Sequence, residues 1–320
     1  MGFRPQGWKS PLNTALTEGP PLPDAPDQKK GYFIGGASFE APRPAPGLYV
    51  VSTPIGNLRD ITIRALETLA GADQVLCEDT RMSARLLDHY GIRTPRKALH
   101  EHNERARAEG IADEIAAGRV IALISDAGTP LLSDPGFPLV RTLAERNLPV
   151  FAIPGPSALL SALAVAGLPT DAFSFIGFLP AKAVARGKAI AALRGRTETL
   201  VFYESPRRLD DALAALAEHL GPDRPAAVAL ELTKRFERVE RGTLGELASF
   251  FAADETRGEA VIVVAGASEP ETPDAADWQA ELATALDGQP LRSAVDAVAE
   301  KYGLKRKDVY DAALALKAAR

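Results

Sequence analysis

The sequence predicts an α/β protein built from two α/β domains and a small helical segment at the C-terminus. Three observations predict this fold class. Apolar runs typical of buried strands alternate with helical patterns over most of the chain. In the first half, each apolar run leads into a loop of small residues, which is how parallel strands end at a ligand crevice. The length of 320 residues is enough for two domains of ordinary size.

The composition excludes several classes of protein. The chain is 46% hydrophobic and 25% charged, with a net charge of −5, so it lacks an overall basic excess. No apolar run is long enough for a membrane span, and no N-terminal secretory signal is visible. The single cysteine, Cys77, cannot form an internal disulfide, and the four histidines lack metal-ligand spacing. We therefore expect a cytoplasmic protein without a membrane segment and without a bound metal.

The first elements follow in order along the chain. Residues 1–46 are rich in proline and are expected to form a disordered extension. The N-terminal α/β domain then covers residues 47–155. Its strands are predicted at 48–51, 74–77, 120–124 and 149–153, with helices at 61–69, capped by Asp60, and at 111–117. Because strand, loop and helix alternate, we expect a parallel sheet with its loops gathered at one edge.

The C-terminal α/β domain covers residues 156–266. Its strands are predicted at 173–178, 199–203, 226–232 and 260–264, and its helices at 157–166, 188–193, 208–219 and 244–252, the last capped by Thr243. Some connections are short, so we expect a mixed sheet. Residues 267–276 are expected to be a linker. Residues 277–320 are expected to form helices around a turn at Gly303, either as a helix-turn-helix or as a cap on the second domain.

The most informative loop covers residues 125–136, directly after an apolar strand. Ala127 and Gly128 let a ligand approach the backbone, whereas Pro130 and Pro135 stiffen the loop. A plain connection with two turns is the alternative interpretation. Neither the glycine-rich fingerprint of a nicotinamide dinucleotide site nor that of a P-loop appears at these strand ends. The crevice is therefore predicted to hold another kind of ligand.

Six motifs lie in order at residues 53–57, 78–81, 125–130, 133–136, 153–158 and 202–208. Together they resemble the ribosomal RNA small-subunit methyltransferase I family, a branch of the tetrapyrrole-methylase superfamily. The resemblance implies two α/β domains of tetrapyrrole-methylase type with the ligand cleft between them. It implies S-adenosyl-L-methionine as methyl donor and 2′-O-methylation of a cytidine ribose in the decoding centre of 16S ribosomal RNA, in the small ribosomal subunit. It also implies a homodimer.

The resemblance further implies which residues line the donor site. They are Pro54, Asp126, Ala127, Gly128, Leu131, Ser157, Ala158, Glu204 and Thr233. Small residues could offer backbone groups to the donor, and Pro54 and Leu131 could pack on its apolar surface. Asp126 could face the donor's positive charge or instead hold its loop as an Asx-turn, and Ser157 could act only as a helix N-cap.

On the acceptor side, Glu78 and Arg81 follow a predicted strand at the same edge of the sheet. Glu78 is the candidate general base for a ribose hydroxyl, and Arg81 could hold a phosphate. A surface ion pair between Arg81 and an aspartate is the plainer interpretation, and positioning without any base could also suffice. RNA would be bound by local basic clusters. The candidates are Arg93, Arg96 and Lys97; Lys182, Arg186 and Lys188; Arg194 and Arg196; Arg207 and Arg208; and Lys305, Arg306 and Lys307.

Two other functions fit the same residues. A methylase of a tetrapyrrole or another small acceptor would share the fold, although residues 52–57 and 126–130 depart from the usual motifs of the tetrapyrrole branch. A non-catalytic ribosome-assembly factor would bind RNA and keep the crevice without activity. Transfer of labelled methyl groups into isolated small subunits separates all three.

Overall fold

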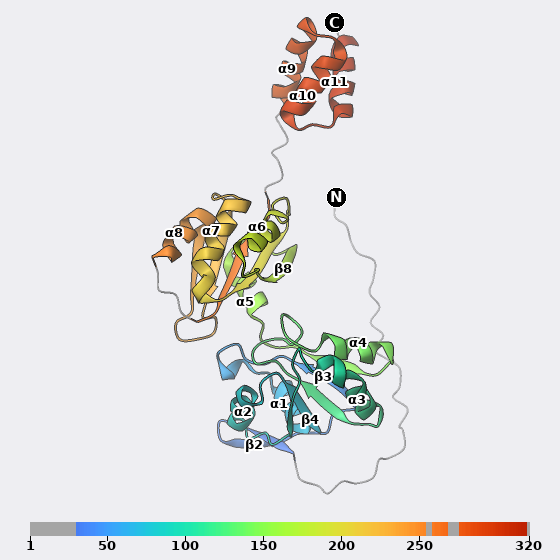
Figure 1. The fold of residues 1–320 in the computed structure, drawn as a ribbon, viewed down its shortest axis with the longest axis vertical. Coiled ribbons are helices and arrows are strands. Elements are labelled where there is room, and N and C mark those ends of the chain that lie inside the picture. Colours follow the sequence, from blue (N-terminus) through green and yellow to red (C-terminus); the bar gives the residue numbers. More distant parts are fainter. Residues whose placement is uncertain (1–29, 254–257, 268–274, 319–320) are drawn as a thin grey trace.

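The computed structural model describes residues 30–253, 258–267 and 275–318, and Figure 1 shows the path of the chain. The first sheet has the strand order β5-β4-β6-β3-β7, and every neighbouring pair is parallel, as expected. Its strands are β3 (Gly47–Val51), β4 (Gln74–Cys77), β5 (Arg96–Ala98), β6 (Val120–Leu123) and β7 (Val150–Ile153). The carboxyl ends of these strands therefore lie at one edge, where the loops expected to bind a ligand gather.

Helices cover both faces of this sheet. They are α1 (Ile63–Gly71), α2 (Thr80–His89), α3 (Glu104–Ala116) and α4 (Phe137–Glu145). Because side chains alternate along a strand, Leu48 and Tyr49 of β3 point to opposite faces. Tyr49 packs in a core with α1 and α2, and Leu48 packs in a second core with α3 and α4. The first domain thus has three layers.

Two expectations about the N-terminal region are wrong. Residues 30–46 do not belong to a disordered extension, because β1 (Gly31–Ile34) and β2 (Ala37–Glu40) form an antiparallel hairpin. Tyr32 is buried in the first core, and the Phe33 amide donates to the Tyr90 carbonyl at 2.8 Å. The rest of the expected extension, residues 1–29, lies outside the described residues.

The expected cap of the first helix is also wrong. Asp60 lies in the 3-10 helix η1 (Leu58–Asp60), and α1 begins two residues later than predicted. The Thr62 hydroxyl caps α1 by accepting from the Ala65 amide at 3.1 Å. A threonine and an aspartate both make good N-caps, so the sequence alone did not separate them.

The second sheet has the order β11-β10-β12-β9-β8 and is mixed, as expected, because only β8 and β9 run parallel among its hydrogen-bonded pairs. Its strands are β8 (Phe173–Phe178), β9 (Thr199–Glu204), β10 (Pro225–Leu230), β11 (Arg238–Thr243) and β12 (Ala260–Val264). The strand β11 was not predicted. It is a polar edge strand, and polar edge strands lack the apolar alternation that marks a half-buried strand.

One helix covers one face of the second sheet and three cover the other. The helix α5 (Ala158–Ala166) packs on the first face, together with Ile55 of the first domain. The helices α6 (Ala183–Ala191), α7 (Leu209–Leu220) and α8 (Leu244–Ala252) cover the opposite face, and the 3-10 helix η2 (Pro206–Arg208) precedes α7. Thr243 caps α8 in a complete capping box with Glu246, as its position predicted. Ile55 joins the two domains through a shared apolar cluster.

The C-terminal segment has its own core. It consists of α9 (Ala275–Gly288), α10 (Leu291–Tyr302) and α11 (Arg306–Ala318), of which α9 was not predicted as a separate helix. Val295, Val298 and Val309 are buried together with Leu282 and Ala313. The predicted apolar stripes therefore pack against each other. Of the expected linker, residues 268–274 lie outside the described residues, and residues 275 and 276 belong to α9. No described helix is both long and apolar enough to cross a membrane.

Candidate functional site

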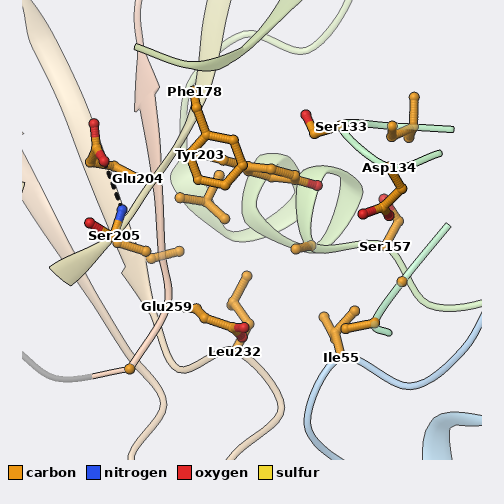
Figure 2. A pocket seen from close by; sticks show the side chains of 18 of the residues that line it. Ile55, Ser133, Asp134, Ser157, Phe178, Tyr203, Glu204, Ser205, Leu232 and Glu259 are labelled. Carbon is orange, nitrogen blue, oxygen red and sulfur yellow. Dashed lines mark hydrogen bonds between the residues drawn. The ribbon is translucent and has the colours of Figure 1, made fainter. Parts of the chain in front are cut away.

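A cavity of about 410 Å³ lies between the two α/β domains (Figure 2). Its volume is in the range of small-molecule and cofactor sites. The first domain contributes Ile55 and the loop after β6, and the second contributes the N-terminus of α5 and the ends of β8, β9 and β12. The cavity thus lies where the strand-end loops of the first domain meet the second domain.

The loop after β6 is fixed at its first turn. The Thr53 amide donates to the Gly128 carbonyl at 2.8 Å, and the Gly128 amide donates to the Thr53 carbonyl at 3.0 Å. Gly128 has a φ of +77°, and a Cβ there would lie 3.3 Å from Cγ2 of Ile55. A side chain at this position would strain the backbone and fill space at the cavity wall. Gly128 therefore leaves bare backbone facing the cavity.

The same loop is fixed again at its far end. The Gly136 amide donates to Oε2 of Glu104 at 2.6 Å, and Glu104 is 8% exposed. Between these two anchors, Leu131 and Ser133 have φ values of +74° and +68°. A left-handed backbone conformation is strained at residues other than glycine, and residues strained in this way are often found at ligand sites. The loop is therefore pre-organised, and nothing in the sequence pattern indicated the role of Glu104.

The second domain supplies a polar wall at the end of β9. The Tyr203 hydroxyl accepts from the Leu159 amide at the start of α5, at 3.1 Å. Glu204 is 3% exposed, accepts from the Ser205 amide at 2.8 Å and has Arg208 Nη2 at 3.2 Å from Oε2. Burial raises the pKa of both Tyr203 and Glu204 above their ordinary values. These groups are fixed by the fold before any ligand arrives.

The opposite wall is a loop that follows β10. Glu231 and Thr233 have φ values of +49° and +66° there. Lys234 Nζ donates to Glu231 at 2.8 Å and to Glu259 at 3.0 Å. Leu232 and Glu259 line the cavity. Four of the five non-glycine residues with positive φ in the described part of the chain thus lie in two loops beside the cavity.

Six of the nine predicted donor residues line the cavity. They are Asp126, Ala127, Gly128, Ser157, Ala158 and Glu204. Ser157 also caps α5 by accepting from the Leu160 amide at 3.4 Å, so the expected N-cap role is present together with the position at the cavity. Pro54, Leu131 and Thr233 are not among the lining residues. Their immediate neighbours in the sequence, Ile55, Leu132 and Leu232, line the cavity instead.

Glu78 and Arg81, the predicted acceptor-side residues, do not line the cavity. Arg81 is 88% exposed at its side chain and pairs with Asp79 at 2.8 Å, which is the plainer of the two interpretations. Asp79 also caps α2, and its hydrogen bonds with Arg81 lower its pKa to about 2. Burial and the Asp126 charge raise the pKa of Glu78. Glu78 therefore lies outside the cavity lining but close enough to Asp126 for the two charges to interact.

Asp134 lines the cavity and was not predicted. Burial, with the charges of Glu78 and Asp126, raises its pKa to about 6, although a hydrogen bond with Ser125 acts in the opposite direction. Asp134 belongs to one of the six motifs, as does Tyr203. That membership was the signal in the sequence that could have pointed to both residues.

Several of the cations predicted to bind RNA form ion pairs within the protein. Arg96, Arg186, Arg196, Arg208 and Arg306 lie within 4 Å of an acidic side chain. Others have exposed side chains, namely Arg93, Lys97, Lys182, Lys188, Arg194, Arg207, Lys305 and Lys307. An exposed cation can meet a phosphate without breaking a structural ion pair. The second group is therefore the better set of candidates for a phosphate contact.

Comparison with known proteins agrees with this architecture. Residues 47–248 match the model of the tetrapyrrole (corrin/porphyrin) methylases, and residues 272–317 match that of the RsmI C-terminal HTH domain. The crystal structure of a diphthine synthase has a TM-score of 0.51 at 17% identity, covering 68% of this chain and 89% of its own. That of the methyltransferase CobJ has a TM-score of 0.50 at 21% identity, covering 69% and 94%. The match of residues 47–248, which is more than half of the chain, shows that the chain belongs to the tetrapyrrole methylase family, and the solved structures show the same fold.

Full-length relatives narrow the assignment. A ribosomal RNA small subunit methyltransferase I of Mesorhizobium japonicum is 46% identical over 285 residues, which cover 89% of this chain and 97% of the relative. The protein of the same name from Escherichia coli O157:H7 is 45% identical over 269 residues, which cover 83% and 94%. The chain belongs to the ribosomal RNA small subunit methyltransferase I family.

Proposed function

We propose that this protein methylates the ribose 2′-hydroxyl of a cytidine in the decoding centre of 16S ribosomal RNA, with S-adenosylmethionine as donor. The observation that carries the proposal is the extent of the match to relatives named ribosomal RNA small subunit methyltransferase I. The match covers 83–89% of this chain in the two relatives above, across both α/β domains. A separate match covers the C-terminal helices. The choice of a cytidine as the methylated nucleotide, and of its 2′-oxygen as the methylated atom, is implied by the resemblance of the sequence motifs to the family.

The cavity suits this donor in size and chemistry. S-adenosylmethionine carries a sulfonium, an amino acid group, a ribose and an adenine, and it supplies an electrophilic methyl group when bound. Ala127, Gly128 and Ala158 leave room for backbone contacts with such a ligand. The Glu204 carboxylate lines the cavity, and its Oε2 is buried without a hydrogen bond in the described structure, although Arg208 Nη2 lies 3.2 Å away as an ion-pair partner. A ribose hydroxyl of the donor could donate the hydrogen bond that this oxygen lacks.

The protein's own residues would contribute mainly by positioning. The loop of residues 125–136, anchored at Gly128 and Gly136, can hold donor and acceptor in line without rearranging. The apolar residues Ile55, Leu232 and Val261 line the cavity and would exclude water from it. The exposed cations outside the cavity would meet RNA phosphates.

We also propose a cellular location and an oligomeric state for the protein. A ribosomal substrate would place the enzyme in the cytoplasm. The family resemblance supports a homodimer, which sedimentation equilibrium of the purified protein would test. A mass of one chain at all concentrations would contradict the dimer.

The test of the function is transfer of labelled methyl groups. The protein is incubated with labelled S-adenosylmethionine and either assembled small subunits, naked 16S RNA or a tetrapyrrole acceptor. We expect incorporation into ribosomal RNA at one cytidine, and resistance of the following phosphodiester bond to alkali shows that the 2′-oxygen is modified. Incorporation only into the tetrapyrrole, or into no acceptor, would contradict the proposal.

A further inference from the structure

Four carboxylates line the cavity, and three of them are already engaged. Glu204 accepts from the Ser205 amide and lies beside Arg208, and Glu259 is paired with Lys234 at 3.0 Å. Asp126 accepts from the Asp79 amide at 3.3 Å. Among the described residues, Asp134 forms no ion pair within 4 Å and accepts from no backbone amide, and Ser125 is the one side chain whose hydrogen bonding lowers its pKa. It is therefore the cavity carboxylate best able to accept a proton.

The position of Asp134 is fixed on both sides. It lies two residues before Gly136, which is held by the buried Glu104, and next to Ser133, which faces Gly177 of β8. Figure 2 shows the Asp134 side chain directed into the cavity, toward Tyr203 of the second domain. The Tyr203 hydroxyl already accepts from the Leu159 amide, so its own proton is free to be donated into the cavity. A carboxylate held this firmly beside a hydroxyl donor has the geometry of an acid–base site.

We propose that Asp134 is the general base that accepts the proton of the acceptor hydroxyl, an inference that rests on the proposed function and deepens it. As the proton passes to the Asp134 carboxylate, the acceptor oxygen forms its bond to the donor methyl carbon. The carbon–sulfur bond breaks and its electron pair returns to sulfur, which leaves a neutral thioether. Asp134 then releases the proton to water, so one proton is set free for each methyl group transferred.

The charged surroundings of Asp134 make its role depend on pH. Glu78 at the end of β4 and Asp126 in the same loop face it with like charge, Ser125 hydrogen-bonds to it, and Tyr203 faces it from β9. Burial and the two like charges raise its pKa to about 6. A base with this pKa is largely ionised at neutral pH and still accepts a proton well.

The first experiment measures single-turnover methyl transfer to small subunits as a function of pH. In the wild type we expect the rate to rise with pH and to level off above an inflection near the pKa of Asp134. Asp134→Asn should lower the plateau by about 10²-fold or more and abolish the inflection. Glu78→Gln should move the inflection to lower pH, because it removes a like charge. Asp223→Asn, an exposed aspartate outside the cavity, is the matched control and should behave as the wild type.

A second measurement does not depend on activity. The raised pKa means that the folded protein holds this proton more tightly than the unfolded chain. The stability that Asp134 contributes is therefore present below its ordinary pKa of 3.8 and is lost as pH rises through about 6. The melting temperature of Asp134→Asn, relative to wild type, should accordingly rise between about pH 4 and about pH 8. No such rise would show that the carboxylate is not held in this environment.

The outcomes separate the inference from the function on which it rests. Calorimetric titration should give Asp134→Asn a donor affinity within a few-fold of wild type. A loss of tenfold or more would assign the carboxylate to the donor's positive charge and overturn the inference. An Asp134→Asn enzyme that transfers methyl groups at the wild-type rate, with the same inflection, would also overturn it. If the wild type methylates no ribosomal RNA, the proposed function falls, and the inference with it.

Discussion

At Gly128, the backbone conformation, the hydrogen bonds and the neighbouring side chain all restrict which residue can be present. Its positive φ suits glycine, its carbonyl and amide both pair with Thr53, and its Cα faces Ile55 at the cavity wall. A side chain here would meet a strained backbone and a crowded wall together. The residue is therefore required both for the turn and for the space beside it.

We expect Gly128→Val to block binding of S-adenosylmethionine while the domain stays folded. The valine side chain would occupy space at the cavity wall, and its left-handed backbone would cost about 1–3 kcal/mol of stability. Calorimetric titration of the purified variant measures the affinity, and circular dichroism checks the fold. Gly195→Val is the matched control, because a Cβ at Gly195 meets nothing within 4 Å. Wild-type donor affinity in Gly128→Val would contradict the placement of the donor.

At the scale of elements, the loop of residues 125–136 depends on a helix that is far away in the sequence. Glu104, at the start of α3, accepts from the Gly136 amide at the start of α4. This hydrogen bond is buried, and its acceptor is a carboxylate, so it is stronger than an ordinary one. The loop is positioned by the packing of these two helices as much as by its own prolines.

Glu104→Ala should therefore lower stability by about 1–3 kcal/mol, because it leaves the buried Gly136 amide unpaired. It should also weaken donor binding, since the loop loses its second anchor. Glu104→Gln keeps an acceptor oxygen and should restore most of both properties. Denaturant unfolding and calorimetric titration measure the two effects. Equal losses in the alanine and glutamine variants would show that the charge matters instead of the anchor.

Elements with a strong periodic pattern could be predicted from the sequence. The strands β4, β8 and β12 and the helix α8 lie at the predicted residues, since each combines an apolar pattern with a clear start or end. The polar strand β11 and the hairpin of β1 and β2 gave no such pattern. The hairpin depends on Tyr32 reaching a core built from later residues, which local sequence does not reveal.

The cavity could be predicted only in part, for a related reason. Gly128 lies in a loop of small residues after a strand, so its place at the cavity followed from that pattern, whereas the place of Ser157 was implied by the family resemblance. The ionisation of Asp134 depends on Glu78, which lies 56 positions earlier in the sequence and on another strand end. Charge coupling of this kind needs the folded arrangement. Glu78 was consequently predicted as the base, although it lies outside the cavity lining.

At the scale of the whole molecule, the C-terminal helices form a separate unit. The buried residues of α9, α10 and α11 contact one another in a core of their own. Lys305 is exposed in the turn between α10 and α11 and Lys307 is exposed in the first turn of α11, whereas Arg306 is paired with Asp296. A self-contained unit with exposed cations favours docking on RNA over capping of the second domain.

We expect truncation after Ala267 to leave the melting temperature of the two α/β domains and their donor affinity near those of the full chain. Binding to small subunits should weaken, and its dependence on salt should become shallower, because phosphate contacts set that dependence. In the full chain, Lys305→Ala with Lys307→Ala should reduce the salt slope by about one per lysine. A large fall in melting temperature with loss of donor binding would show that the tail is a cap.

The strand order of the second sheet has a consequence for synthesis of the protein on the ribosome. The strand β12 lies between β9 and β10, yet it is the last of the five to be made. Until it emerges, the nascent chain holds two half-sheets, β8 with β9 and β10 with β11, each with an unpaired apolar edge. The first domain, complete at β7, can fold meanwhile. A nascent chain stopped before Ala260 should therefore carry a folded first domain and an aggregation-prone second one.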